Sequence, residues 1–308
     1  MTPGPEFRPL DDVVYGRVDQ VSPMIRRVVA ENPSKFTYRG TGTYVVGHGR
    51  VAVIDPGPLL DSHRDALAAA LRGEQVTAIV VTHCHSDHSP LAAWLAAETA
   101  APTYAFGPHP RGDDAQVDGD DVKVEEATDH AFSPDVAVAD GATIARGPGW
   151  TLRGVHTPGH TSNHLCVAFA EERVLFPGDH VMGWSTTVVS PPDGDMAAYI
   201  NSLRKVGGRD DDRTYWPTHG PVIEMPQRYV ARLVEHRLWR ERQVLDAVRT
   251  GHVDIPAIVA TLYAAVAKEL HEPAGRSVLA HLAKLVDEGA VRVTGGGRPR
   301  LVSRYEAA

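Results

Sequence analysis

The sequence has little of what would place it among secreted or membrane proteins. Among 308 residues there are 2 cysteines, Cys84 and Cys166, too few for a disulfide framework, which favours a reducing, cytoplasmic setting. No apolar run approaches the roughly 20 residues that a membrane-spanning helix needs. The first ten residues contain several prolines and no apolar segment followed by a small-residue cleavage site. Neither a secretory signal nor a membrane partner is therefore expected.

Charge is unevenly distributed along the chain. The formal net charge is −8, yet the part from Arg228 onward has 13 basic and 9 acidic side chains. The part before it has 18 basic and 30 acidic side chains. Such asymmetry predicts two domains with different surfaces. The basic excess of the second part is too small to indicate nucleic-acid binding by itself.

Short strands and helices alternate in the first part of the chain. The stretches 43–46 and 51–54 predict a hairpin, and the apolar run 76–81 is typical of a buried strand. Helices are expected at 62–71 (capped by Ser62), 90–97 and 196–206, and further strands at 151–156, 165–169 and 173–176. The acidic segment 107–131 is interpreted as a solvated insertion, with a lid over the site as the alternative.

From residue 227 onward the pattern becomes helical. A long amphipathic stretch covers 229–249, and two shorter helices, at 255–263 and 277–287, precede a two-stranded wing at 289–293 and 299–302. Helices followed by a hairpin predict a small winged-helix module, a relative of the helix-turn-helix. The predicted domains are therefore 1–226 and 227–308.

The densest group of metal-ligand side chains directly follows the predicted strand 76–81. His83, His85, Asp87 and His88 fall within six residues, with the spacing H-x-H-x-D-H. Imidazole nitrogens and carboxylate oxygens are the usual protein ligands of zinc and neighbouring divalent metals. A single histidine is more often a structural residue, but four such side chains at this spacing predict a metal site.

Three more residues of ligand type follow predicted strands or apolar segments, each at a turn with glycine or proline. They are His160, Asp179 and His219. In layered α/β folds, functional sites assemble at the carboxyl ends of strands. We therefore expect all seven side chains to meet at one edge of the fold.

This order of motifs resembles the metallo-β-lactamase superfamily over roughly residues 12–223. The resemblance implies an α/β fold, the αβ/βα metallo-β-lactamase sandwich, followed here by the small C-terminal winged-helix domain. It places one metal ion on His83, His85 and His160, a second on Asp87, His88 and His219, and Asp179 as a bridge between them. Zinc is the expected metal, with iron or manganese as alternatives, and no organic cofactor is expected.

The same resemblance implies the chemistry. Two metal ions would share a hydroxide that attacks the substrate, and Asp87 would orient this hydroxide or accept its proton. The zinc β-lactamases have cysteine where this chain has Asp179, and the flavodiiron branch has glutamate where it has His85. β-Lactam hydrolysis is therefore not expected as the main activity, and a redox function is disfavoured. A bridging carboxylate instead resembles the branch that hydrolyses thioesters, lactones and phosphodiesters.

Several neighbours of these positions are interpreted as supporting residues. Asp55 either orients a metal-bound histidine or only shapes its own turn. His164 and His180 are expected to be orienting or structural residues rather than ligands. Cys84 should point away from the metals. Trp184, Ser185 and Thr186 either line the substrate pocket or form a surface loop.

The C-terminal sequence resembles the winged-helix tail of the β-lactamase-like protein 2 branch. That branch includes a single-strand-specific endoribonuclease. The matching motifs are His236-Arg237, Arg240-Glu241, residues 258–263, residues 281–285 and Glu288-Gly289.

Several functions follow as hypotheses. The favoured one is hydrolysis of a small ester, thioester or lactone, with the winged helix used for packing or for assembly into a homo-oligomer. The first alternative is an endoribonuclease acting on single-stranded RNA, which the acidic first domain opposes. In that case phosphates would be held by Arg292, Arg298, Arg300 and Arg304. The second alternative is a winged-helix regulator with a sensory metal site, which the full set of seven ligands argues against. The third alternative is a mononuclear-iron oxygenase.

Overall fold

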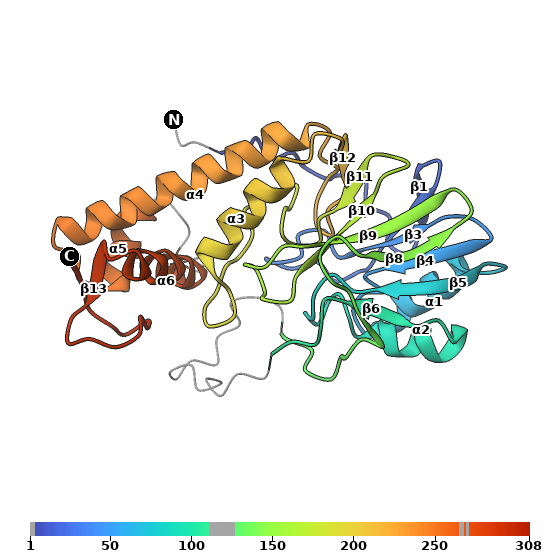
Figure 1. Ribbon diagram of the computed structural model, residues 1–308, viewed down its shortest axis with the longest axis horizontal. Helices are drawn as coiled ribbons and strands as arrows, with labels where there is room; N and C mark the ends of the chain where they lie inside the picture. The colour runs from blue at the N-terminus through green and yellow to red at the C-terminus, as the bar shows by residue number, and fades with distance from the viewer. Residues whose placement is uncertain (1–3, 111–126, 265–267, 269–270) are drawn as a thin grey trace.

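Two β-sheets packed face to face form the centre of the protein, described here from a computed structural model (Figure 1). The structure describes residues 4–110, 127–264, 268 and 271–308. Most of the expected insertion or lid, residues 111–126, lies outside the described residues. None of the described helices combines the length and the apolar composition needed to cross a membrane.

The first sheet has seven strands in the order β1-β2-β3-β4-β5-β6-β7. Strands β1 to β4 pair antiparallel, and β4 to β7 pair parallel. The bounds are β1 Val18–Ser22, β2 Ile25–Val29, β3 Gly42–Val46, β4 Arg50–Ile54, β5 Gln75–Val80, β6 Thr103–Ala105 and β7 Val136–Ala137. The predicted hairpin is formed by β3 and β4.

The second sheet has five strands in the order β12-β11-β10-β9-β8. Strands β8 to β11 pair antiparallel, whereas β12 runs parallel to β11. The bounds are β8 Thr143–Gly147, β9 Trp150–His156, β10 Leu165–Phe169, β11 Val174–Phe176 and β12 Thr214–Tyr215. Strands β9, β11 and β12 therefore point the same way, and their carboxyl ends lie at one edge.

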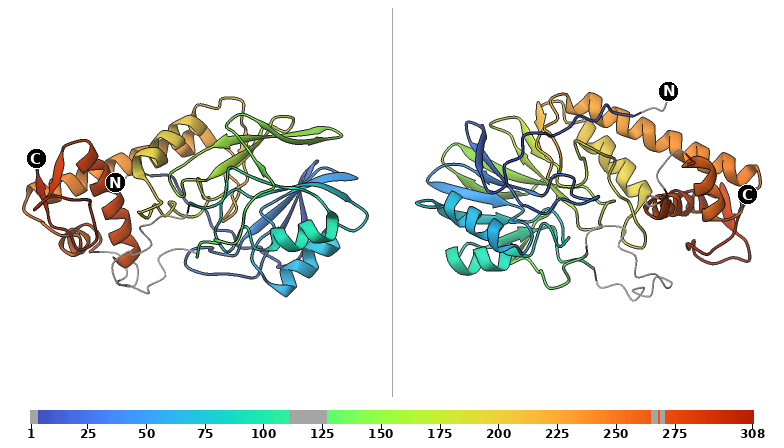
Figure 2. Two further views of the ribbon diagram at one scale, coloured as in Figure 1. Left: turned by 60° about the horizontal axis from the view of Figure 1, so that its bottom comes forward. Right: turned by 180° about the vertical axis from the view of Figure 1, so that it is seen from behind.

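Helices cover the outer face of each sheet, as the two views of Figure 2 show. In β10, Leu165 and Val167 pack between the sheets while Cys166 faces the helices, because successive side chains of a strand point to opposite faces. Helices α1 (Asp61–Ala70) and α2 (Leu91–Thr99) cover the first sheet, and α3 (Met196–Gly207) and α4 (Pro226–Arg249) the second. These four layers confirm the predicted αβ/βα sandwich.

The cap predicted for the first helix is wrong. Helix α1 begins at Asp61, so that Ser62 lies inside its first turn, and the N-cap position is Leu60 with no side-chain hydrogen bond. The cap of α3 is present, because the Asp195 carboxylate accepts a hydrogen bond from the Ala198 N–H.

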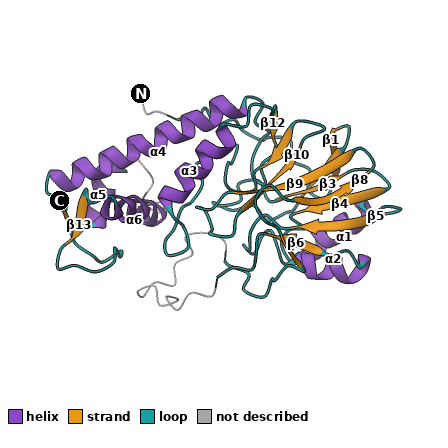
Figure 3. Cartoon of the chain, viewed as in Figure 1, coloured by secondary structure: helices purple, strands orange, loops and turns teal. Residues whose placement is uncertain are grey.

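The C-terminal part consists of helices followed by a short hairpin, on the left in Figure 3. Helices α5 (Ile255–Leu262) and α6 (His271–Asp287) precede β13 (Val291–Val293) and β14 (Tyr305–Ala307). The second wing strand was predicted at 299–302, but Tyr305–Ala307 pairs with β13 instead. Tyr305 is fully buried in this core, and Pro299 has no N–H to donate to a partner strand.

Helix α4 joins the two parts of the chain. Val230 and Leu233 in its first half pack against α3, whereas Val244 and Val248 pack in the C-terminal core. Because one helix contributes to both cores, the boundary between residues 226 and 227 stays a prediction.

Candidate metal centre

Seven side chains of metal-ligand type meet at the edge where β5, β9, β11 and β12 end. The loop from β5 to α2 supplies His83, His85, Asp87 and His88, and the loops after β9, β11 and β12 supply His160, Asp179 and His219. All seven are buried. The sequence brings them together because each follows a strand whose carboxyl end lies at this edge.

Two glycines allow the loops to approach one another. Gly159 has a φ of 137°, and a Cβ there would lie 2.3 Å from the Tyr199 Cα atom of α3. Gly178 has a φ of 52°, and its Cβ would lie 2.7 Å from the His164 Nε2 atom. A Cβ would clash at both positions, and the φ of Gly159 also favours glycine strongly, so both residues are needed to seat the ligand that follows.

Two groups of three side chains share no member, and a further group of His83, His88 and Asp179 overlaps both. In the first group, the Nδ1 atom of His85 lies 3.0 Å from the Nε2 of His83 and 3.2 Å from the Nε2 of His160. In the second group, the Oδ2 atom of Asp87 lies 3.1 Å from the Nε2 of His219 and 3.3 Å from the Nε2 of His88. Each group could hold one metal ion.

The Asp179 carboxylate lies between the two groups. Its Oδ1 atom is 3.4 Å from the Nε2 of His219 and 3.6 Å from the Nε2 of His88. Its Oδ2 atom is 4.0 Å from the Nε2 of His160 in the other group. One oxygen thus faces each group, which is the arrangement that a bridging carboxylate requires.

Several of these histidines direct one nitrogen to the centre and the other to an oxygen. The Nδ1 of His160 lies 2.7 Å from the carbonyl oxygen of Val188, and that of His219 lies 3.1 Å from the carbonyl oxygen of Gly40. A carbonyl oxygen only accepts hydrogen bonds, so Nδ1 carries a proton and Nε2 is directed at the centre. Metal-binding histidines are oriented in this way in other proteins.

Asp55 orients His88 by the same principle. Its buried carboxylate accepts hydrogen bonds from the Thr82 N–H and the Thr82 hydroxyl, both at 2.8 Å. The Nδ1 of His88 lies 2.9 Å from its Oδ2 atom. Of the two alternatives for Asp55, the geometry therefore favours orientation of a ligand residue.

The electrostatics of the centre depend on burial and on neighbouring charges. Burial, followed by the adjacent imidazoles, holds the pKa of His83 well below its usual range. Burial also opposes the protonation of His219, but Asp179 and Asp87 outweigh it and raise its pKa to about 10. Burial would raise the pKa of Asp87, yet His88 and His219 keep it far below normal. The part of the centre around Asp87 and Asp179 therefore attracts positive charge.

The donor set fits a pair of divalent metal ions. The Nε2 of His88 and the Oδ1 of Asp179 are buried and make no hydrogen bond within the described part of the chain. Leaving buried polar atoms unpaired costs about 1–3 kcal/mol each, so such atoms at the meeting point of seven ligand-type residues indicate a bound partner. Imidazole and carboxylate together suit zinc, iron or manganese.

The other predicted neighbours lie outside the two groups. The Nδ1 of His164 lies 2.9 Å from the Thr157 hydroxyl, and its Nε2 accepts a hydrogen bond from the Asp179 N–H at 3.3 Å. His180 contacts the edge of Tyr199, with ring centroids 5.0 Å apart, and burial lowers its pKa to about 3. The Cys84 thiol accepts a hydrogen bond from Asn163, and burial raises its pKa to about 11.

A small cavity of about 20 Å³ opens on the two groups. Beside four of the ligand-type residues it is lined by Phe36, Met182, Thr187 and Val188. Trp184, Ser185 and Thr186, for which pocket lining and a surface loop were the two alternatives, belong to the same loop but are not among these lining residues. The Trp184 ring instead stacks on the Tyr38 ring, with centroids 4.8 Å apart. Phe36 was missed altogether, because no motif surrounds it in the sequence.

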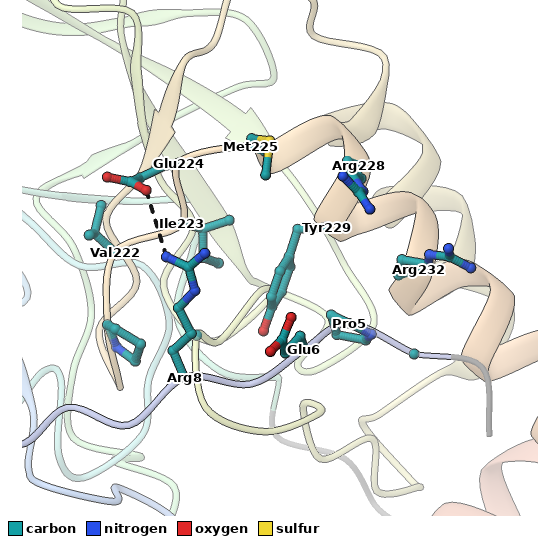
Figure 4. Close-up of a pocket in the computed structure, with 13 residues that line it drawn as sticks. Pro5, Glu6, Arg8, Val222, Ile223, Glu224, Met225, Arg228, Tyr229 and Arg232 are labelled. Carbon is teal, nitrogen blue, oxygen red and sulfur yellow. Dashed lines mark ion pairs between the residues drawn. The ribbon is translucent and has the colours of Figure 1, made fainter. Parts of the chain in front are cut away.

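A second cavity, of about 570 Å³, lies between the N-terminal segment and the start of α4 (Figure 4). Its charged lining consists of Glu6, Arg8, Glu224, Arg228 and Arg232. Figure 4 shows Arg8 paired with Glu224, at a distance of 3.7 Å. None of the seven ligand-type residues lines it, so it is separate from the metal centre.

Comparison with known proteins gives consistent results. Residues 38–219 match the family described as the metallo-beta-lactamase superfamily, and residues 255–298 match the beta-lactamase associated winged helix domain. The chain is 32% identical to an atrochrysone carboxyl ACP thioesterase of Aspergillus chevalieri, over 91% of this chain and 86% of the relative. It is 30% identical to a beta-lactamase-like protein 2 homolog of Caenorhabditis elegans, over 89% and 88%.

Among solved structures, the chain is similar to a beta-lactamase domain protein from Burkholderia ambifaria. The TM-score is 0.79 at 22% identity, covering 98% of this chain and 97% of the other. At that identity the likeness concerns the fold alone. The fold match extends over both the sandwich and the C-terminal part.

Proposed function

The chain belongs to the metallo-beta-lactamase superfamily of hydrolases, and from that premise we propose that it hydrolyses a small thioester, ester or lactone. We propose further that two zinc ions serve the reaction. One would be held by His83, His85 and His160 and the other by Asp87, His88 and His219, with Asp179 between them. The observation that carries this proposal is the convergence of two ligand groups on one carboxylate.

The chain's own residues have separate tasks in this hydrolysis. Metal ions bound at the two groups would supply Lewis acidity, which lowers the pKa of water towards neutrality and polarises a carbonyl. Asp87 would orient the attacking water or accept its proton, and its Oδ2 atom belongs to the second ligand group. The hydroxyl of Thr41 donates a hydrogen bond to that atom at 2.9 Å and keeps the carboxylate in place.

The lining of the cavity supports a small acyl substrate. Phe36, Met182 and Val188 present apolar surface beside the ligand groups. Apolar side chains beside the ligand groups favour an acyl group over a charged phosphate at the reacting position. The name of the relative from Aspergillus chevalieri, a carboxyl ACP thioesterase, supports a thioester as the first choice.

The same lining offers less to RNA. No lysine or arginine is among the described residues that line the small cavity, whereas phosphodiesters are normally held by basic side chains. Arg292, one of the arginines considered for RNA, is paired with Glu306 at 2.8 Å. An acyl substrate is therefore the better-supported hypothesis.

The test is a substrate panel with a metal-site variant. Release of thiol from acyl thioesters would be followed alongside hydrolysis of lactones and of single-stranded RNA oligomers. Asp179→Ala should abolish turnover and lower metal content, because it removes both oxygens between the groups. Asp140→Ala, at a surface carboxylate paired with Lys205, is the matched control and should keep both. Full turnover of Asp179→Ala with two metals bound would contradict the bridging role.

A further inference from the structure

The loop at 182–188 both lines the small cavity and contacts the candidate ligands. The Thr187 hydroxyl donates to the carbonyl oxygen of Asp179 at 2.7 Å. The next carbonyl, that of Val188, accepts the Nδ1–H of His160 at 2.7 Å. The position of this short segment therefore determines where His160 and Asp179 present their ligand atoms.

Helix α4 holds this loop at two carbonyl groups. The Arg237 guanidinium donates a hydrogen bond to the carbonyl oxygen of Thr187. Two turns earlier on the same helix, the Tyr229 hydroxyl donates to the carbonyl oxygen of Met182 at 2.8 Å. Figure 4 shows the Tyr229 side chain extending from α4 toward the body of the protein. Both ends of the loop are thus fixed from the helix that leads into the C-terminal part.

Arg237 is a costly residue for a purely structural position. Only 3% of it is exposed, and its Nε atom has no hydrogen-bond partner in the described part of the chain. No carboxylate among the described residues forms an ion pair with it. Burying a charge without a counter-charge is unfavourable, and an apolar side chain would fill the same volume at lower cost.

A further contact of Arg237 leads to the residues just before this loop. Its guanidinium carbon lies 5.2 Å from the centroid of the Tyr199 ring. The Tyr199 hydroxyl in turn donates to the carbonyl oxygen of His180 at 3.0 Å. The guanidinium therefore supports the segment after Asp179 both directly and through an aromatic ring.

We propose that α4 is a positioning element of the metal centre and that Arg237 is its principal residue. The guanidinium fixes the Thr187 carbonyl, and the adjacent Val188 carbonyl then orients His160 toward His83 and His85. The C-terminal part of the chain thereby sets the geometry of the first ligand group. This inference rests on the proposed metal-dependent function.

The experiment compares Arg237→Met with Arg240→Met on the full-length chain. Arg240 lies one turn further on the same helix, against the rings of Trp239 and Tyr263, and has no contact with the loop. Zinc affinity would be measured by competition with a chromophoric chelator. Arg237→Met should weaken one of the two zinc sites about 10- to 100-fold, the range typical of residues that orient ligands. Arg240→Met should bind both zinc ions as the unmodified chain does.

Two further readouts separate positioning from general destabilisation. Added guanidinium at millimolar concentration should partly restore zinc binding to Arg237→Met, whereas sodium chloride at the same ionic strength should not. Tyr229→Phe, which keeps the ring and removes one hydrogen bond, should show a smaller loss at the same site. If Arg237→Met does not fold, Tyr229→Phe still tests whether α4 positions the metal centre. An unaltered zinc affinity of Tyr229→Phe would overturn that role of α4.

Other results also overturn the inference. These are zinc binding by Arg237→Met equal to that of the unmodified chain, an equal loss in Arg240→Met, or no zinc binding by the unmodified chain. If the unmodified chain binds two zinc ions but hydrolyses no acyl substrate, the proposed substrate class fails. The affinity comparison between the variants still decides the role of Arg237.

Discussion

Asp55→Asn should weaken the second metal site without unfolding the protein. Asp55 has a φ of 49°, in the left-handed region that asparagine tolerates well, so the backbone can stay in place. The Asp55 Oδ1 atom accepts the Thr82 N–H, a group that only donates. The single acceptor of asparagine must therefore occupy the Oδ1 position. Its NH₂ group then takes the position of Oδ2, 2.9 Å from the Nδ1 of His88.

This substitution reverses the proton position on His88. An NH₂ group donates to Nδ1, so the imidazole carries its proton on Nε2. That atom points at Asp87 and Asp179, where the metal would bind. Changes in residues that orient metal-bound histidines typically reduce metal affinity 10- to 100-fold, which corresponds to about 1.4–2.7 kcal/mol.

The assay is stepwise removal of metal by a competing chelator. One of the two metals should dissociate at a lower chelator concentration in Asp55→Asn than in the unmodified protein. Thr218→Val is the control, because its hydroxyl contacts the same carboxylate at 3.3 Å but does not decide the His88 tautomer. Equal affinity of both sites in Asp55→Asn and the unmodified chain would refute the reasoning.

Three other predictions concern the fold. Leu282 is fully buried in the C-terminal core, and Leu282→Ala should lower the free energy of unfolding by about 2–5 kcal/mol in a urea titration. A loss below about 1 kcal/mol would contradict the packing role of Leu282. Asp195→Ala should cost about 1 kcal/mol in the same measurement, since it removes the cap of α3; no loss would mean that water replaces the cap. Burial lowers the pKa of His63 to about 4, so the unfolded chain binds a proton at a higher pH than the folded chain does. The free energy of unfolding should therefore decrease as the pH falls from about 6.5 to 4, by about 1.4 kcal/mol per pH unit. Stability measured across this range should fall less steeply in His63→Gln, and an unchanged slope would show that His63 does not contribute.

The sandwich and the convergence of the seven side chains follow from local features of the sequence. Strands such as β5 are continuous apolar runs because both of their faces are covered. His83 to His88 are recognisable because four ligand types crowd into one loop. His160, Asp179 and His219 each stand beside a glycine that bends the chain, so the ends of the preceding strands are visible in the sequence itself.

What the sequence could not reveal depends on contacts between distant segments. Arg237 contacts Thr187, 50 residues earlier, and no local pattern links them. Phe36 reaches the cavity from a loop without a motif. The second wing strand was misplaced because the segment after the three glycines extends further than a tight turn, and burial of Tyr305 decides which residues pair.

The most direct test of the central claim is the metal content of the protein purified without chelator. Elemental analysis should count all first-row transition metals per chain. About two metal ions per chain, predominantly zinc, is the expected result, with Asp179→Ala clearly lower. A single iron per chain would contradict the two-metal hydrolase, and no bound metal after incubation with zinc, iron and manganese would contradict the metal centre itself.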